Sequence, residues 1–245
     1  MSQALQADAP VNQSVERAVR LLGFFSPEEP ELTLADLTAR LGTSKATTHR
    51  YTLALRRVGL LRYDSARAVY ALGPRIVELA AAALAGLRII KIAGPHMERL
   101  VAELNETVVL SIWDGESPIV VRADDNTERI ARIVVRAGSR LPLTTSAQGK
   151  VFGAFLPELE NRLDSDELQV IRASRIAINS EVVAGIRAVA TPVFQDRELV
   201  AAMAVVGTAA TIPDDPRSPL ARTLRGAAER LSDELGFLPS ERSAR

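Results

Sequence analysis

The chain has 245 residues, of which 47% are hydrophobic and 24% are charged, and its formal net charge is zero. These proportions are typical of a globular protein with one large or two small domains, and they favour no class of partner. The absence of cysteine excludes disulfides, thiolate catalysis and cysteine metal sites. Residues 1–10 lack the basic and apolar regions of a signal peptide, and the most apolar stretch, residues 76–87, is too short to span a membrane. We therefore expect a soluble cytoplasmic protein with no membrane partner.

The balanced total hides a basic N-terminal segment. Residues 11–75 contain ten Lys/Arg and six Asp/Glu, and residues 43–67 contain six basic residues and one acidic residue. A local basic patch on a neutral protein is typical of a site that binds a polyanion. This segment is therefore the first candidate for contact with a nucleic acid.

The first predicted helix follows a tail, residues 1–10, that we expect to be disordered. It covers residues 13–25, and helical spacing places one apolar set on a single face. That set is Val15, Ala18, Val19, Leu22 and Phe25.

Two further helices and a hairpin follow. Thr33 is placed to cap a helix over 34–41, with Asp36 at the capping-box position and Gly42 at its end. Ser44 is placed to cap a third helix that runs to about Val58. Residues 60–63 and 69–72 read as a short β-hairpin. The order predicts a helix-turn-helix followed by a wing.

The third helix has two different faces when its residues are placed 100° apart. The predicted core stripe is Thr48, Tyr51, Thr52, Leu55 and Val58. The opposite side carries small residues between cations, namely Lys45, Ala46, Thr47, Arg50, Ala54 and Arg57. A helix with such a face fits the major groove of double-stranded DNA, where arginine reads guanine bidentately and small methyl groups contact thymine.

We predict a distinct DNA contact for each cation of this segment. Arg50 and Thr47 are the candidates for base reading, with the neighbouring methyl group of Ala46. The candidates for phosphate contact are Lys45, Arg56, Arg57 and Arg62. Arg67, near the hairpin tip, is expected to enter the adjacent minor groove. The alternative is a solvated amphipathic helix that has no ligand.

Beyond residue 73 the pattern changes. An alanine-rich helix over 74–92 is expected to act as a rigid linker, and a second helix over 95–105 follows. Strands are predicted on either side of Asp114-Gly115, over 130–138, and on either side of residues 195–197. A loop feeds a helix near residues 147–156, and an amphipathic helix over 220–236 closes the chain. Helices beside an antiparallel sheet predict an α+β second domain.

Several of these segments resemble the IclR-type transcriptional regulators. The resemblance is carried by SVERAVRLLGFF, by LTLADLTARLGTSKATTHRYTLALRRVGLL and by YALGPRIVELA. It continues through RAGSRLPLTTSAQGKVFGAFLP and EVVAGIRAVATPVF, so that it covers about residues 11–237. Motifs of both family domains appear in the family's order.

The resemblance implies a fold, a domain division and partners. It implies a winged helix-turn-helix DNA-binding domain over 11–73, a linker helix over 74–92, a GAF/PAS-like effector-binding domain over 93–238 and a tail over 239–245. It further implies a homodimer or dimer of dimers on a palindromic operator, controlled by a small organic acid or aromatic effector, with repression favoured over activation. No cofactor, metal or catalytic residue is expected. Two departures from the family pattern concern the third helix. Ala46 stands where the family often has serine. Thr48 and Thr52 replace more apolar residues, and we expect the hydroxyls of these two threonines to bond back to helix carbonyls.

The effector site is expected at the helix start in TTSAQGK. This segment offers Ser146, Ala147, Gln148 and Gly149, with backbone N–H groups at a helix start that suit an anion. The alternative is a helix start that is capped and binds nothing.

The resemblance adds four further positions to this site: Asn179, Ala188, Ala204 and Val206. In related carboxylate sensors several of these positions are polar. The loss of polar side chains at these positions predicts a larger, more apolar ligand, aromatic or branched, with its polar end at the helix start. Trp113 is a further candidate for the lining, with packing under the sheet as the favoured alternative.

Two other function classes fit the sequence less well. An enzyme is disfavoured because the two histidines, His49 and His96, lie in no catalytic or metal-binding motif, and neither His-Glu-x-x-His nor Gly-x-Ser-x-Gly occurs. A winged-helix module that binds protein without DNA contact is the remaining alternative. Arg50 and Thr47 on a small-residue face argue against it, because protein docking needs no bidentate arginine there.

Overall fold

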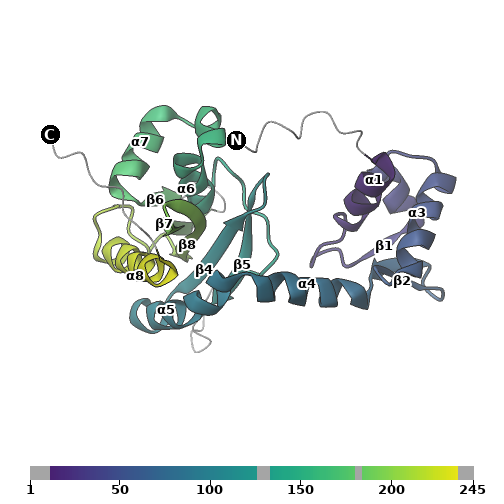
Figure 1. Cartoon of the computed structure of the whole chain (residues 1–245), viewed down its shortest axis with the longest axis horizontal. Coiled ribbons are helices and arrows are strands. Elements are labelled where there is room, and N and C mark those ends of the chain that lie inside the picture. Colours follow the sequence, from purple (N-terminus) through teal and green to yellow (C-terminus); the bar gives the residue numbers. More distant parts are fainter. Residues whose placement is uncertain (1–11, 126–132, 180–183, 237–245) are drawn as a thin grey trace. The chain divides into compact units, whose positions relative to one another are not determined.

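The computed structural model describes residues 12–125, 133–179 and 184–236. The chain divides after Gly86 into two compact units (Figure 1). None of the helices in the described ranges combines the length and the apolar character needed to cross a membrane.

The N-terminal unit is a winged helix-turn-helix. Its elements are α1 (Gln13–Leu22), β1 (Glu31–Thr33), α2 (Leu34–Leu41), α3 (Lys45–Arg57), β2 (Leu61–Asp64), β3 (Val69–Leu72) and α4 (Pro74–Gly86). Strand β3 lies between β1 and β2 in an antiparallel sheet. The predicted hairpin is confirmed, whereas β1 was not predicted. The core contains Leu21, Leu32, Leu37, Leu41, Leu55, Leu61 and Tyr70.

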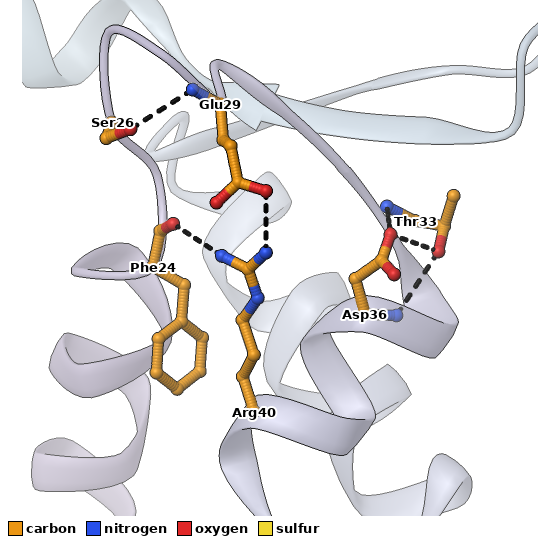
Figure 2. A network of polar contacts seen from close by, with 6 residues as sticks. All are labelled: Phe24, Ser26, Glu29, Thr33, Asp36 and Arg40. Atoms are coloured by element: carbon orange, nitrogen blue, oxygen red, sulfur yellow. Dashed lines mark hydrogen bonds and ion pairs between the residues drawn. The ribbon is translucent and has the colours of Figure 1, made fainter.

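Local hydrogen bonds fix the start of α2, as predicted. Figure 2 shows the capping box: Thr33 Oγ1 accepts from the Asp36 N–H at 3.2 Å, and the Asp36 carboxylate accepts from the Thr33 N–H at 2.9 Å. The hydrogen bonds from the Thr33 hydroxyl and then from its backbone N–H hold the pKa of Asp36 below its usual value. Gly42 ends α2 with φ of 67°, and Ser44 Oγ caps α3 by accepting from the Thr47 N–H. These three predicted caps are confirmed.

The loop before β1 is attached to α2 by Arg40. Its guanidinium donates to the Glu29 carboxylate at 2.9 Å and to the Phe24 carbonyl at 3.3 Å (Figure 2). The Glu29 N–H in turn donates to Ser26 Oγ. This network therefore gives the segment between α1 and β1 a defined path.

Two glycines bring the base of the wing against the end of α3. Gly59 has φ of 77°, which glycine adopts without strain. A Cβ on Gly73 would lie only 2.1 Å from the Gly59 carbonyl oxygen. The Gly73 N–H donates to the Leu60 carbonyl at 2.9 Å. Backbone contact thus limits how far the wing and the end of α3 can move together or apart at this point.

One predicted core position is wrong, and the predicted apolar face of α1 is only partly buried. Val15 and Val19 on that face are 58% and 61% exposed, whereas Leu21 of the same helix is fully buried. Val58 is 57% exposed, because α3 ends at Arg57 and Val58 no longer follows the helical stripe.

The alanine-rich helix α4 ends at Gly86, earlier than the expected 74–92. Leu87 leaves the helical conformation, and α5 begins at Arg88. Glycine is a poor helix former, and Ile89 is buried in the core of the second unit. Residues 88–92 therefore belong to α5.

The second unit is an α+β sandwich. Its elements are α5 (Arg88–Leu104), β4 (Thr107–Trp113), β5 (Pro118–Asp124), α6 (Ala147–Phe155), the 3₁₀ helix η1 (Pro157–Arg162), α7 (Ser165–Ser174), β6 (Ala177–Asn179), β7 (Ile186–Gln195), β8 (Glu198–Thr208) and α8 (Pro219–Leu235). The antiparallel sheet has the order β5-β4-β8-β7-β6. The turns at 114–115 and 195–197 and the last helix are confirmed. The elements η1, α7 and β6 were not predicted.

The two faces of this sheet carry side chains of different size. Toward α5 and α8 the strands contribute large residues, which include Val108, Leu110, Met203 and Val205. Toward α6 and α7 they contribute Ala177, Ala190, Ala202 and Ala204. The small residues leave room for α6 to lie close to the sheet.

Helix α6 also packs closely against the segment before it. A Cβ on Gly149 would lie 2.2 Å from the Leu143 carbonyl oxygen and 2.5 Å from that of Pro142. The first turn of α6 therefore requires glycine at this position.

The strand predicted over 130–138 is wrong for its described part. Residues 133–136 form no strand, and Gly138 turns the chain with φ of 88°. Only Arg140 forms a bridge, with Ile119. Residues 130–132 lie outside the described ranges.

We predict that Gly149→Ala lowers the free energy of unfolding of the second unit by about 1–3 kcal/mol, because a methyl group has no space beside the two carbonyls. Gly86→Ala is the matched control, since a Cβ there meets nothing within 4 Å and alanine favours helix. Urea unfolding measures the free energy of unfolding of both variants. Equal stability of the two variants would contradict the close contact.

Candidate DNA interface and ligand pocket

Helix α3 presents most of the predicted DNA contacts on its exposed side. Lys45, Ala46, Arg50 and Arg57 are exposed, and Thr47 is half-buried. The opposite side is held in the core by Thr48, Thr52 and Leu55. The burial of that side fixes the rotation of the helix and so decides which residues face outward.

The hydroxyls of α3 divide as expected between cap, core and outer surface. Thr48 Oγ1 donates to the Ser44 carbonyl at 3.3 Å, and Thr52 Oγ1 donates to the His49 carbonyl at 2.9 Å, so the expected bonds to helix carbonyls are confirmed. Ser44 Oγ donates to Thr47 Oγ1 at 3.0 Å. Because Thr47 accepts this bond, its own hydroxyl hydrogen remains available to a base.

Four arginines line an open hollow between α3 and β2. They are Arg50, Arg56, Arg57 and Arg62, and the hollow has a volume of about 850 Å³. Within the described ranges, no carboxylate forms an ion pair with any of the four. Arg56 lies over the Tyr63 ring, 5.0 Å from its centroid. Four unneutralised cations around one concave surface form a strong site for a polyanion.

Arg67 is arranged differently from the other predicted cations. Its Nη1 donates to Glu31 Oε1 at 2.8 Å, and its Nη2 lies 2.6 Å from Glu31 Oε2. The hydrogen bond that the Arg67 guanidinium donates to this carboxylate raises the pKa of the guanidinium above its usual value. The arginine expected in the minor groove is thus held by an acid of its own domain.

The structure adds exposed residues that the sequence did not predict as contacts. His49 and Tyr63 line a second hollow, of about 660 Å³, together with Lys45, Arg56 and Thr38. Lys45, His49 and Arg56 fall within 40° on a helical wheel, so this stripe was visible in the sequence. Leu53, 46% exposed, lies beside Arg50 in the first hollow.

The second unit contains a cavity of about 250 Å³ at the start of α6. Six of the eight predicted effector residues line it: Ser146, Ala147, Gln148, Asn179, Ala188 and Val206. The remaining lining residues are apolar and were not predicted: Ile133, Val134, Val135, Leu141 and Ile186. Ile133, Val134 and Val135 come from the part of the predicted strand over 130–138 that is irregular in the structure.

Two predicted effector residues do not line the cavity. Gly149 faces the carbonyls of residues 142 and 143, and its N–H donates to Ser146 Oγ at 2.9 Å. Ala204 is fully buried in the core beneath α6. Both residues support the wall of the cavity from behind.

The polar groups of the cavity differ in how far they are already bonded. Ser146 Oγ caps α6 and also donates to the Pro142 carbonyl. Gln148 is 3% exposed, and its side-chain amide forms no hydrogen bond with any residue that the structure describes. The backbone N–H groups of Ala147 and Gln148, in the first turn of α6, also have no recorded acceptor there. These donors and the Gln148 amide are the free polar groups at this end of the cavity.

Trp113 does not line the cavity. Its ring packs against Phe152, with 5.6 Å between the ring centroids, in the core between α6 and the sheet. The favoured alternative, packing under the sheet, is therefore confirmed.

Comparison with known proteins gives the same two-part division. Residues 14–65 match the model of the IclR helix-turn-helix domain, and residues 81–164 and 160–233 match the bacterial transcriptional regulator IclR C-terminal model. The HTH-type transcriptional regulator KipR of Bacillus subtilis is 29% identical over 92% of this chain and 98% of the relative. The DNA-binding transcriptional repressor YiaJ of Escherichia coli is 28% identical over 92% of this chain and 89% of the relative.

A solved structure confirms the fold. It is that of an IclR homologue from Microbacterium hydrocarbonoxydans in complex with 4-hydroxybenzoate, and it superposes with a TM-score of 0.75 at 22% identity. The match covers 91% of this chain and 98% of the other. These relatives are regulators and not enzymes. The family models together cover most of the chain, which therefore belongs to the IclR family of DNA-binding transcriptional regulators.

Proposed function

We propose that this regulator is a repressor whose affinity for its operator is controlled by a compact, largely apolar ligand bound at the start of α6. Residues 11–73 bind DNA in this proposal and residues 93–238 bind the ligand, with 74–92 between them. The observation that carries it is the Gln148 amide, which no described residue bonds, in an apolar cavity of a chain whose four α3 and β2 arginines have no ion pair with any described carboxylate.

The DNA contacts follow from the exposed face of α3. Arg50 and Thr47 read bases in the major groove, because Arg50 is unpaired and Thr47 retains a free hydroxyl hydrogen. Lys45, Arg56, Arg57 and Arg62 bind phosphates. The protein-interaction alternative is not supported, since the family is one of DNA-binding regulators.

The lining of the cavity supports an aromatic or branched ligand with one polar end. No lysine, arginine or histidine contributes to the described lining, so a small acid with several charges lacks a counter-charge there. The volume of about 250 Å³ lies near the lower limit of ligand pockets, which suits a single substituted ring. The related protein in complex with 4-hydroxybenzoate supports the same ligand class.

Control of DNA binding requires that the ligand binds one functional state better than another. We infer a homodimer, or a dimer of dimers, on a palindromic operator, in which ligand binding changes the spacing of the two DNA-binding domains. Exposed Val77, Leu79 and Leu84 on α4 support self-association, because a single chain leaves them uncovered. Repression is supported by the relative YiaJ, which is a repressor.

The test begins with selection of bound duplexes from a random pool. The selected duplex is then challenged with a compound library that contains 4-hydroxybenzoate, other substituted benzoates and two- or three-carbon acids. Release of the protein from the duplex by a ring compound supports the proposal. Calorimetry in which only the two- or three-carbon acids bind would refute the ligand class.

We predict that Arg50→Ala weakens binding to the selected operator by about 1–3 kcal/mol and weakens binding to mixed-sequence DNA less, because a bidentate base contact is lost. Arg56→Ala should weaken both duplexes alike and reduce the salt slope by about one. Fluorescence anisotropy with both duplexes measures the ratio of the affinity for the selected operator to the affinity for mixed-sequence DNA. An unchanged ratio for Arg50→Ala would show that Arg50 reads no base.

We predict that Gln148→Leu weakens ligand binding about tenfold or more, because a charged polar end loses a buried hydrogen bond. DNA affinity without ligand should not change. Gln169→Leu, on the exposed surface of α7, is the matched control. Calorimetry measures the affinity of each variant for the compound that releases the protein from DNA. Equal affinities for the two variants would exclude Gln148 from the site.

A further inference from the structure

The ion pair between Glu31 and Arg67 joins two elements of the wing sheet. Glu31 begins β1, and Arg67 lies in the turn between β2 and β3. The Asp64 carboxylate accepts from the N–H groups of Ala66 and Arg67, which fixes the turn itself. The backbone of the turn is therefore held without Glu31, whose carboxylate bonds the guanidinium end of Arg67 and no other side chain that the structure describes.

Glu31 also lies near a second proposed phosphate contact. In the sheet, Ala71 is opposite both Glu31 and Arg62, so all three side chains share one face. The small Ala71 leaves a hollow of about 160 Å³, which Glu31 and Arg62 both line. A negative charge thus shares this face of the sheet with a cation of the surface that would contact DNA, and it pairs with a second one.

We propose that Glu31 competes with DNA for Arg67 and thereby limits the contribution of the wing to DNA binding. The inference rests on the DNA interface proposed above. Both terminal nitrogens of Arg67 face Glu31 oxygens, at 2.8 and 2.6 Å, which is the bidentate arrangement that a phosphate would otherwise take. DNA must exchange with the carboxylate, and the released carboxylate then repels nearby phosphates.

This exchange discriminates among DNA sites. An arginine that is already neutralised gains little from an ordinary phosphate, since one anion replaces another. It gains more from a narrow minor groove, where the negative potential is strongest. Glu31 therefore lowers the affinity for all DNA but lowers it least for sites with a narrow minor groove beside the wing. The competing carboxylate thereby increases specificity.

The test compares Glu31→Gln with the unmodified protein on a mixed-sequence duplex of about 30 base pairs. The variant should bind more tightly, and its salt slope should be steeper by about 0.9. The advantage of the variant should therefore shrink roughly threefold between 50 and 200 mM salt. Glu29→Gln is the matched control, because it removes the same charge from an acid that pairs with Arg40 instead (Figure 2).

Further variants separate this proposal from the proposed function. Glu31→Gln should tighten binding far less in an Arg67→Ala background than in the unmodified protein, because Glu31 acts chiefly through Arg67. Weaker or unchanged binding of Glu31→Gln overturns the proposal, as does equal tightening by Glu29→Gln or an Arg67→Ala variant that binds normally. If Glu31→Gln does not fold, as judged by thermal unfolding, Glu31→Ala replaces it. Loss of specificity in Arg50→Ala would support the DNA interface even if Glu31 has no such role.

Discussion

The turn between α2 and α3 is the constraint on which the DNA-facing surface depends. Gly42 takes the left-handed conformation there, and Ser44 caps the next helix two residues later. Together they set the direction in which α3 leaves the turn, while the buried hydroxyls of Thr48 and Thr52 fix its rotation. Arg50 faces outward as a consequence of these contacts. Its exposure is therefore a property of the fold and not of arginine's preference for water.

The second unit combines a well-packed core with a cavity beside it. Large residues fill the sheet face beneath α5 and α8, whereas alanines on the other face let α6 lie close to it. The cavity lies at the start of this helix, where Ala188 and Val206 of the sheet contribute to its lining. The free polar groups of Gln148 lie at this helix start.

Local features of the fold were predictable from the sequence, and long-range ones were not. Helix caps and two-residue turns depend on neighbours within four positions, so Thr33, Gly42 and Ser44 revealed them directly. The pairing of Arg67 with Glu31 joins residues 36 positions apart, and the three-residue β1 has no periodicity to detect. The cavity wall over 133–141 was missed for a related reason, because an apolar run does not distinguish a strand from an irregular segment that lies against a pocket.

The contact between Gly73 and the Gly59 carbonyl has a consequence for how this surface evolves. It is a backbone contact, so side-chain substitutions on the outer face of α3 leave the helix and the wing at the same separation. In the proposed DNA interface, the base preference of α3 can therefore change while the distance between helix and wing stays the same. A larger residue at position 73 would instead change that distance, and with it the length of DNA that the proposed interface spans.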